Sequence, residues 1–244
     1  MKEYRGKIIL TSVVTVLPIV IGLLLWNRLP DTIATHFTFD NVANGWSSKP
    51  FTVLGLPIIL TVLHLVAVTV SLNDPKRKNI GGKMLSVVFW IVPIVSWVMF
   101  LSIYTNALNM SINISMISGV LVGTIFLVTG NYMSKNRQNY TVGIKLPWTL
   151  NSTENWNRTN RFAGRLWLVA GAIMLVNIFL NQTAILIGMI VVIGVAPVIY
   201  SFVLYKNGNL KEMSVPRMAQ TFLLVKSKQI GYNESRDIDE KSKG

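Results

Sequence analysis

Few residues in this sequence have the types and the spacing that chemistry at a catalytic or metal site requires. His36 and Asp40 lie four residues apart, but two ligands alone do not hold a metal ion. His64 is the one titratable candidate in the second apolar run, and a lone histidine with no carboxylate partner is more typical of a hydrogen-bonded packing residue than of a proton relay. The sequence has no cysteine, no His-Glu-x-x-His pattern and no phosphate-binding glycine loop. We therefore expect a protein that is not an enzyme and that binds no cofactor and no metal.

The most specific feature of the chain is a polar segment at residues 142–164, VGIKLPWTLNSTENWNRTNRFAG. It places two tryptophans, four asparagines and three basic residues between long apolar runs. Pro147 disfavours a helical conformation at Leu146, so we expect the stretch GIKLPW to be extended. Asn151 with Glu154 three residues later predicts a helix N-cap and its capping-box partner.

From about residue 152 a helix is expected to run without a break into the apolar stretch that follows. One stripe of this helix holds Trp156, Asn160, Ala163 and Trp167, and a neighbouring basic stripe holds Arg158, Arg161 and Arg165. Two interpretations are open and compatible. The helix lies along the headgroups with its arginines on lipid phosphates, or the Asn/Trp face and KLPWT form a docking surface for another molecule.

The composition indicates that lipid rather than water is the solvent of most of this chain. Of 244 residues, 51% are hydrophobic and 14% are charged, and the mean hydropathy is +0.49, whereas a soluble domain carries about 25% charged residues. No Asp, Glu, Lys or Arg occurs from Met84 to Ser134 or from Leu166 to Tyr205. One span needs about 20 apolar residues, so each of these runs holds two spans. We predict an all-α integral membrane protein with six transmembrane helices, at about residues 8–26, 51–72, 84–104, 113–131, 166–180 and 184–205.

The cations are distributed unevenly between the two sides of this six-span arrangement. The net charge is +13, and 21 of the 23 Lys and Arg residues fall in the N-terminus, the second and fourth connections and the tail; only Arg28 and Lys49 lie opposite. Cations accumulate on the cytoplasmic side of membrane proteins, which explains the excess without nucleic acid. We therefore predict that both termini are cytoplasmic (N-in/C-in), that residues 132–165 are cytoplasmic with an interfacial helix, and that nucleic acid is not bound directly. The basic second connection, NDPKRKNIGGK, is interpreted as an anchor to anionic membrane lipids.

Three regions are expected along the chain. They are an N-terminal two-span region at 1–83 with an external loop at 27–50, a four-span region at 84–205 with the cytoplasmic segment 132–165, and a basic cytoplasmic tail at 206–244.

The external loop predicts a small extracytoplasmic β-like structure. IATHFTF is rich in β-branched and aromatic residues, and DNVANGW supplies turn chemistry at Asn44-Gly45. Its aromatic residues either form a belt at the headgroups or belong to a recognition surface, and both interpretations stay open. The candidate ligand-facing residues of this loop are His36, Phe37, Phe39, Asp40 and Trp46.

Prolines and small residues within the spans are expected to be structural. Neighbouring helices should satisfy the carbonyls freed by Pro18, Pro57, Pro93 and Pro197. Small residues four apart let helices approach closely in lipid, and they occur at Ser115, Gly119 and Gly123 and again at Ala184 and Gly188.

The pattern Q-N-Y-T-V-G-I-K-L-P-W-T-L followed by W-x-x-T-N-R-F-A-G, at residues 138–164, resembles the signature of the SdpI family. We call these residues the signature segment. The family consists of membrane immunity proteins against a secreted, membrane-active toxin peptide. Upstream, LPDTIATHF and GWSSKP resemble a domain of unknown function that commonly precedes that region. Together the two resemblances cover about residues 1–205.

The resemblance implies that the protein protects its producing cell from a hydrophobic toxin peptide. It also implies a second role, in which a small transcriptional repressor is held at the membrane once toxin is sensed. Carried onto this sequence, the family pattern gives a candidate cytoplasmic docking set: Gly143, Lys145, Pro147, Trp148, Thr149, Trp156, Asn160, Arg161 and Phe162. The alternative function is a transporter or lipid-interacting membrane protein that handles hydrophobic compounds. The expected partners are a toxin peptide, a small repressor and membrane lipids.

Overall fold

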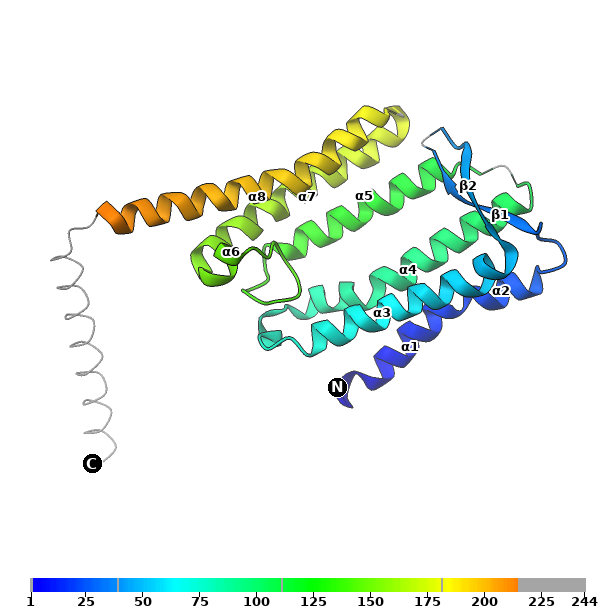
Figure 1. Ribbon diagram of the computed structural model, residues 1–244, viewed down its shortest axis with the longest axis horizontal. Coiled ribbons are helices and arrows are strands. Elements are labelled where there is room, and N and C mark those ends of the chain that lie inside the picture. The colour runs from blue at the N-terminus through cyan, green and yellow to red at the C-terminus, as the bar shows by residue number, and fades with distance from the viewer. Residues whose placement is uncertain (1, 39, 111, 181, 215–244) are drawn as a thin grey trace. The chain divides into compact units, whose positions relative to one another are not determined.

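The computed structural model describes residues 2–38, 40–110, 112–180 and 182–214 (Figure 1). Phe39 and residues 215–244 of the expected basic tail lie outside the described residues. The chain divides into two units, residues 1–201 and 202–244. In the second unit the structure describes the last turns of a helix, where the rings of Phe202 and Tyr205 lie 6.5 Å apart.

Six helical segments are long and apolar enough to cross a membrane, as the sequence predicted. They are α1 (Arg5–Val16) continued by α2 (Pro18–Leu24), a π-helical turn (Phe51–Gly55) continued by α3 (Leu56–Leu72), α4 (Gly82–Ala107), α5 (Ile114–Met133), α7 (Thr153–Leu180) and α8 (Thr183–Ser214). Shorter helices occur at Lys2–Tyr4, Arg77–Asn79 and α6 (Pro147–Asn151). The predicted continuous helix into the fifth span is confirmed by α7. With 28 residues at about 1.5 Å each, α7 is about 42 Å long, about 12 Å longer than a hydrocarbon core of about 30 Å.

The expected β-like loop is confirmed as a two-stranded antiparallel hairpin, but the predicted turn position is wrong. Strand β1 (Thr32–Phe37) pairs with β2 (Ala43–Ser48), with Thr32 opposite Ser48. The connection lies between Phe37 and Ala43, where the Thr38 amide donates to the Val42 carbonyl at 2.8 Å. Asn44 and Gly45 therefore lie within β2. Gly45 is needed there because a Cβ would lie 2.9 Å from the His36 Cβ, next to an irregularity in β1.

Prolines within the spans leave a carbonyl without its helical partner, and tryptophans of neighbouring helices take that place. Pro18 frees the carbonyl of Val14, which accepts a hydrogen bond from the Trp97 indole of α4 at 2.9 Å. Pro197 frees the carbonyl of Ile193, which accepts a hydrogen bond from the Trp167 indole of α7 at 3.4 Å. For these two prolines the expectation that neighbouring helices satisfy the freed carbonyls is confirmed.

α5 and α7 pack so closely that glycine is required at their contact. A Cβ on Gly130 would lie 2.8 Å from the Gly164 carbonyl oxygen, and a Cβ on Gly164 would lie 2.7 Å from the Gly130 oxygen. Gly171 meets Gly123 in the same way, at 2.8 Å. The predicted close approach is thus confirmed at Gly123. Gly188 of α8 faces open space, and no close approach occurs there among the described residues.

The long helices run antiparallel, so their connections gather at two ends (Figure 1). We call one the polar end: residues 73–81, 134–152 and the first turns of α7. The other is the hairpin end: residues 25–50 and 108–113. An apolar cluster lies near each, around Met84 and Phe89 at the polar end and around Ile33 and Phe100 at the hairpin end.

Candidate functional site

A buried carboxylate joins the second connection to the signature segment. Asp74 is 6% exposed. One of its oxygens accepts from the Tyr140 amide at 2.8 Å and from the Thr141 hydroxyl at 2.6 Å, and the other accepts from the Lys76 amide at 2.7 Å. Hydrogen bonds to charged groups contribute about 1.5–3 kcal/mol each. Asp74 therefore fixes the position of residues 140–141 relative to the loop after α3.

Buried amides extend this junction. The Asn79 side chain donates to the Gln138 carbonyl at 2.7 Å, and the Gly81 amide donates to the Asn136 side chain at 3.0 Å. The Gln138 side chain donates to the carbonyls of residues 149 and 150 at 3.0 and 2.7 Å. Asn136 and Gln138 are 5% and 9% exposed. Since buried polar groups are costly unless paired, this network holds the polar end in one arrangement.

Gly143 lies where no side chain fits. Its φ is +133°, a backbone conformation that residues with a Cβ rarely adopt. A Cβ would lie 2.6 Å from the Asn160 side-chain oxygen and 2.8 Å from the Trp156 ring. The same Asn160 oxygen accepts from the Ile144 amide at 2.8 Å. The stretch around Gly143 and Ile144 thus folds back onto the first turns of α7, through the hydrogen bond from the Ile144 amide to the Asn160 side chain.

The Asn/Trp stripe of α7 is internal. Trp156 and Ala163 are 0% exposed and Asn160 is 1% exposed. The Trp156 indole donates to the Asn136 carbonyl at 3.2 Å. Thr149 is also fully buried, and its hydroxyl accepts from the Leu146 amide at 2.8 Å. These residues hold the signature segment together and present no side chain to the surface.

Two local expectations for this segment are corrected. Leu146 is extended as predicted, but Pro147 begins the short helix α6, because proline is favoured in the first turn of a helix. Asn151 is the last residue of α6, so the cap of α7 moves one residue on: the Ser152 hydroxyl accepts from the Asn155 amide at 3.2 Å. Glu154 pairs with Arg158 at 3.3 Å instead of closing a capping box.

The remaining members of the docking set lie on or near the surface. Lys145, Pro147 and Arg161 are exposed. Trp148 and Phe162 are half-buried: the Trp148 indole donates to the Ser201 hydroxyl at 3.0 Å, and the Phe162 ring stacks on Tyr200 at 4.6 Å. The structure therefore brings all nine residues to the polar end, but only part of the set is available to another molecule.

Two of the four cations of the second connection contact the protein, and the interpretation of this connection as a lipid anchor stays a prediction. The Lys76 ammonium donates to the Gln138 side chain at 2.9 Å and lies 5.3 Å from the Tyr140 ring centre. The Arg77 guanidinium lies 4.7 Å from the Tyr4 ring centre. Both side chains are half-buried, and the Arg77 guanidinium also lies 4.0 Å from the Glu3 carboxylate, whereas Lys78 and Lys83 are exposed.

At the hairpin end, the candidate ligand-facing residues are mostly exposed. His36, Asp40 and Trp46 are exposed, Trp46 by 61%, and Phe37 is half-buried. The His36 ring is hydrogen-bonded to the Asn44 side chain. Phe39 belongs to the same candidate set and lies outside the described residues.

The hairpin is attached to the loop before α5 by one turn residue. Asn41 has a φ of 61°, which asparagine tolerates better than most residues. Its side-chain oxygen accepts from the Ser115 amide at 2.7 Å, and its side-chain nitrogen donates to Asn113 at 3.0 Å. The predicted external loops therefore touch each other.

Charge differs strongly between the two ends. Residues 27–50 contain Arg28, Lys49, Asp31 and Asp40, so their formal charges cancel. Lys49 pairs with Asp31 at 3.1 Å. Residues 132–165 contain six cations and one carboxylate, a formal charge of +5.

The described residues contain no group of three His, Asp or Glu side chains that could hold a metal ion. His64 is fully buried, and its Nε2 shares a 2.8 Å hydrogen bond with the Thr11 hydroxyl. This is the packing role that the sequence favoured. The Thr11–His64 pair is enclosed among the spans, away from both ends of the molecule.

Sequence reasoning missed the residues that organise the polar end, above all Asp74, Asn136 and Gln138. A signal was present for Asp74: it is the one carboxylate in a connection with four cations, and it precedes a proline. The amides gave no comparable signal, because their partners are carbonyls whose positions depend on the fold.

Comparisons with known proteins find similarity in two parts of the sequence. Residues 135–201 match the SdpI/YfhL protein family, and residues 13–61 match a domain of unknown function, DUF1648. The chain is 27% identical over 199 residues to "Immunity protein SdpI" of Bacillus subtilis (strain 168). The aligned region covers 82% of this chain and 94% of that protein. The resemblance found in the sequence is thereby confirmed. With six membrane-length helices, the chain is a multi-pass protein of the bacterial cytoplasmic membrane.

No solved structure matches this chain. The family matches lie on either side of α4, and the division of the chain near residue 83 stays a prediction. The same applies to the membrane side on which each end lies.

Proposed function

Because residues 135–201 belong to the SdpI/YfhL family, we propose that this protein is a membrane immunity protein that protects the cell making it from a hydrophobic toxin peptide. The observation that carries this proposal is the similarity to an immunity protein over 94% of that protein's length. The similarity is not confined to the signature segment, so it includes both ends of the molecule.

Protection by binding fits the chemistry of the chain better than export or hydrolysis does. The relative and the family point to a non-enzyme. The apolar runs of α4, α5, α7 and α8 contain no carboxylate from Met84 to Ser134 or from Leu166 to Tyr205. Proton-coupled pumps, by contrast, place ionisable groups within their spans. His64 is already engaged by Thr11. We expect His64→Gln to retain protection, whereas a proton-coupled transporter would lose it.

The proposal assigns toxin contact to the hairpin end. His36, Asp40 and Trp46 are exposed there on a hairpin fixed by Asn41, with Phe37 half-buried beside them. An exposed aromatic ring with a nearby histidine and carboxylate suits an amphipathic peptide, because it offers both apolar area and polar partners.

Protection is tested in toxin-sensitive cells that express the full chain. The cells are challenged with each secreted peptide encoded by the producer's genome, and the lethal concentration is measured together with the amount of protein in the membrane. We expect at least one peptide to require about tenfold more for killing. Unchanged killing by every peptide, with the protein present at normal abundance, would count against the proposal.

The orientation is part of the proposal, because a secreted peptide reaches the hairpin only if the hairpin end is outside. The positive-inside rule supports this orientation, given the neutral hairpin loop and the charge of +5 at residues 132–165. The chain lacks cysteine, so single cysteines report cleanly. In intact cells an impermeant thiol reagent should label Asp40→Cys and not Asn151→Cys, both of which are exposed positions. Labelling of Asn151→Cys alone would reverse the assignment.

A second role, retention of a small transcriptional repressor at the membrane, is supported by the exposed basic residues of the polar end. Lys145 and Arg161 are exposed and have no carboxylate partner among the described residues. The test is recovery of a repressor encoded by a neighbouring gene with the purified protein, with and without toxin. Charge reversal of Lys145 and Arg161 together should abolish recovery, whereas Lys78→Glu should not. Equal recovery from all three proteins, or none from the wild type, rules out this role.

A further inference from the structure

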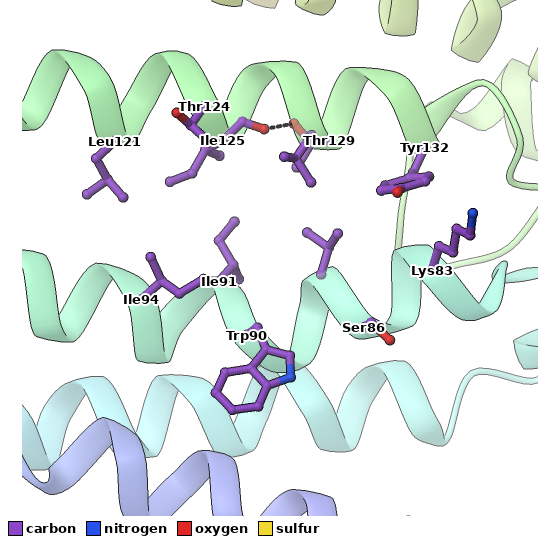
Figure 2. A pocket seen from close by; sticks show the side chains of 12 residues that line it. Lys83, Ser86, Trp90, Ile91, Ile94, Leu121, Thr124, Ile125, Thr129 and Tyr132 are labelled. Atoms are coloured by element: carbon purple, nitrogen blue, oxygen red, sulfur yellow. Dashed lines mark hydrogen bonds between the residues drawn. The ribbon is translucent and has the colours of Figure 1, made fainter.

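A groove between α4 and α5 is lined by none of the residues that the proposals above assign to toxin or repressor contact. Its volume is about 450 Å³, within the usual range for small-molecule sites. Figure 2 shows its two walls, with Ile91 and Ile94 from α4 facing Leu121 and Ile125 from α5. Ile94 is 50% exposed in the protein alone. The groove exists because α5 gives its glycine face to α7, which leaves the opposite face only loosely covered by α4.

The length of the groove matches one leaflet of a bilayer. Along α4 it extends from Lys83 to Ile94, and along α5 from Tyr132 to Leu121, which is eleven helical steps in each case. At about 1.5 Å per residue this is about 16 Å, close to half of a hydrocarbon core about 30 Å thick. An extended acyl chain of one leaflet therefore fits along it.

The two ends of the groove differ in charge. The deep part is lined mainly by aliphatic side chains, with one hydroxyl residue, Thr124, among them. Nearer the mouth, the Thr129 hydroxyl donates to the Ile125 carbonyl at 2.6 Å. At the polar end, Lys83 and Tyr132 point toward each other across the mouth (Figure 2). The Lys135 ammonium lies 5.4 Å from the Tyr132 ring centre.

A third ammonium lies close to this mouth. Lys7 of α1 donates to the hydroxyl of Ser86, which lines the groove, at 3.2 Å. Among the described residues none of these three lysines forms an ion pair with a carboxylate. The mouth is therefore flanked by ammonium groups, those of Lys83 and Lys135, that no carboxylate neutralises among the described residues.

We propose that the α4–α5 groove is a binding site for one anionic phospholipid, with an acyl chain between the two helices and the phosphate at Lys83, Lys135 and the Tyr132 hydroxyl. Charge complementarity selects the occupant: an anionic headgroup gains from each lysine, whereas a zwitterionic headgroup brings its own cation to the same place. The site requires only an apolar chain and a phosphate, so it does not depend on the proposed immunity function.

The test is retention of lipid by the purified full-length chain, measured by native mass spectrometry with phosphatidylglycerol and with phosphatidylcholine of the same acyl chains. We expect one phosphatidylglycerol to be retained about fivefold better for each lysine that contacts it. Lys83→Gln should lower this preference about fivefold. Its matched control, Lys78→Gln, removes an exposed cation of the same connection that does not line the groove, and it should leave the preference unchanged.

Leu121→Trp fills the groove and should abolish retention, with Val66→Trp on the exposed face of α3 as its control. If Leu121→Trp fails to fold, a photoreactive residue at Ile94 serves instead. It should crosslink to phosphatidylglycerol in preference to phosphatidylcholine, while the same residue at Val66 should show no preference. Equal retention of both lipids, or equal effects of Lys83→Gln and Lys78→Gln, overturns the proposal. So does displacement of the lipid by phosphatidylcholine but not by phosphatidylglycerol.

Discussion

The polar end and the hairpin end both contain tryptophan and aspartate, yet they use them in opposite ways. At the polar end these side chains are buried: Trp156 and Asp74 are at most 6% exposed and bond to backbone groups. At the hairpin end Trp46 and Asp40 are exposed. One end thus uses its polar and aromatic residues to fix a backbone, and the other leaves them available to a partner.

This difference changes how a sequence signature is interpreted. The strongest pattern in the chain, the signature segment, contains residues whose first role is to fold the polar end, as Gly143 shows by excluding any side chain. Function at that end then belongs to the exposed neighbours that the buried residues position. The hairpin end carries a weaker pattern but more accessible chemistry.

The largest effect is expected from truncating the same residue type at the two ends. Trp156→Ala removes a fully buried ring whose indole donates to Asn136, so it should lower the stability by about 3–5 kcal/mol and the melting temperature by roughly 10 °C. Trp46→Ala, at a 61% exposed position, should change it by less than about 2 °C. Thermal unfolding of the detergent-purified proteins measures both. Similar losses for the two variants would remove the contrast between the ends.

A second pair of variants replaces one aspartate at each end of the molecule. Asp74→Ala leaves the Tyr140 amide and the Thr141 hydroxyl without their acceptor, which should cost about 3 kcal/mol. Asp40→Ala removes an exposed carboxylate and should be neutral for stability. Limited proteolysis should locate the effect of Asp74→Ala within residues 73–81 and 134–152. Undiminished protease resistance there would show that Asp74 does not hold the two connections together.

The fold was largely predictable because its main determinant, the length of the uncharged apolar runs, can be read directly from the sequence. Uncharged apolar runs such as 84–134 admit one solution in lipid, so the six spans followed from the sequence. The stripe of Trp156 and Asn160 was also predictable from helical spacing. What the stripe faces was not, because that depends on residues 134–144 folding back over it.

The candidate site was less predictable for a related reason. A buried amide such as Gln138 bonds to carbonyls of residues 149–150, and carbonyls carry no sequence signal. The hairpin turn was misplaced because Asn44-Gly45 has the composition of a two-residue turn. The strand register instead places the connection between Phe37 and Ala43, where Asn41 bonds to the first turn of α5.

A smaller effect is expected from releasing the hairpin. Asn41→Gly keeps the left-handed backbone but removes the bonds to Ser115 and Asn113, worth about 1 kcal/mol in total. Hydrogen exchange should accelerate at residues 32–48 while the melting temperature changes little. Val42→Ala, at an exposed position of the same turn, is the control and should leave the exchange unchanged. Unaltered exchange in Asn41→Gly would mean that the hairpin is held by its own strand pairing.

The smallest change in stability is expected for a variant at the hairpin end that nevertheless loses protection. Trp46→Ala is expected to leave abundance and melting temperature near the wild type and to lower protection against the cognate toxin at least threefold, because the exposed indole offers a large apolar contact with a hydrogen-bond donor. Trp46→Phe keeps the apolar area and should retain more protection than alanine. The measurement is the lethal toxin concentration at matched protein levels. Full protection by Trp46→Ala would move toxin contact away from this ring. If Lys145→Ala lost protection at the same time, the recognition surface would lie at the polar end, and the hairpin would be only a connector between two spans.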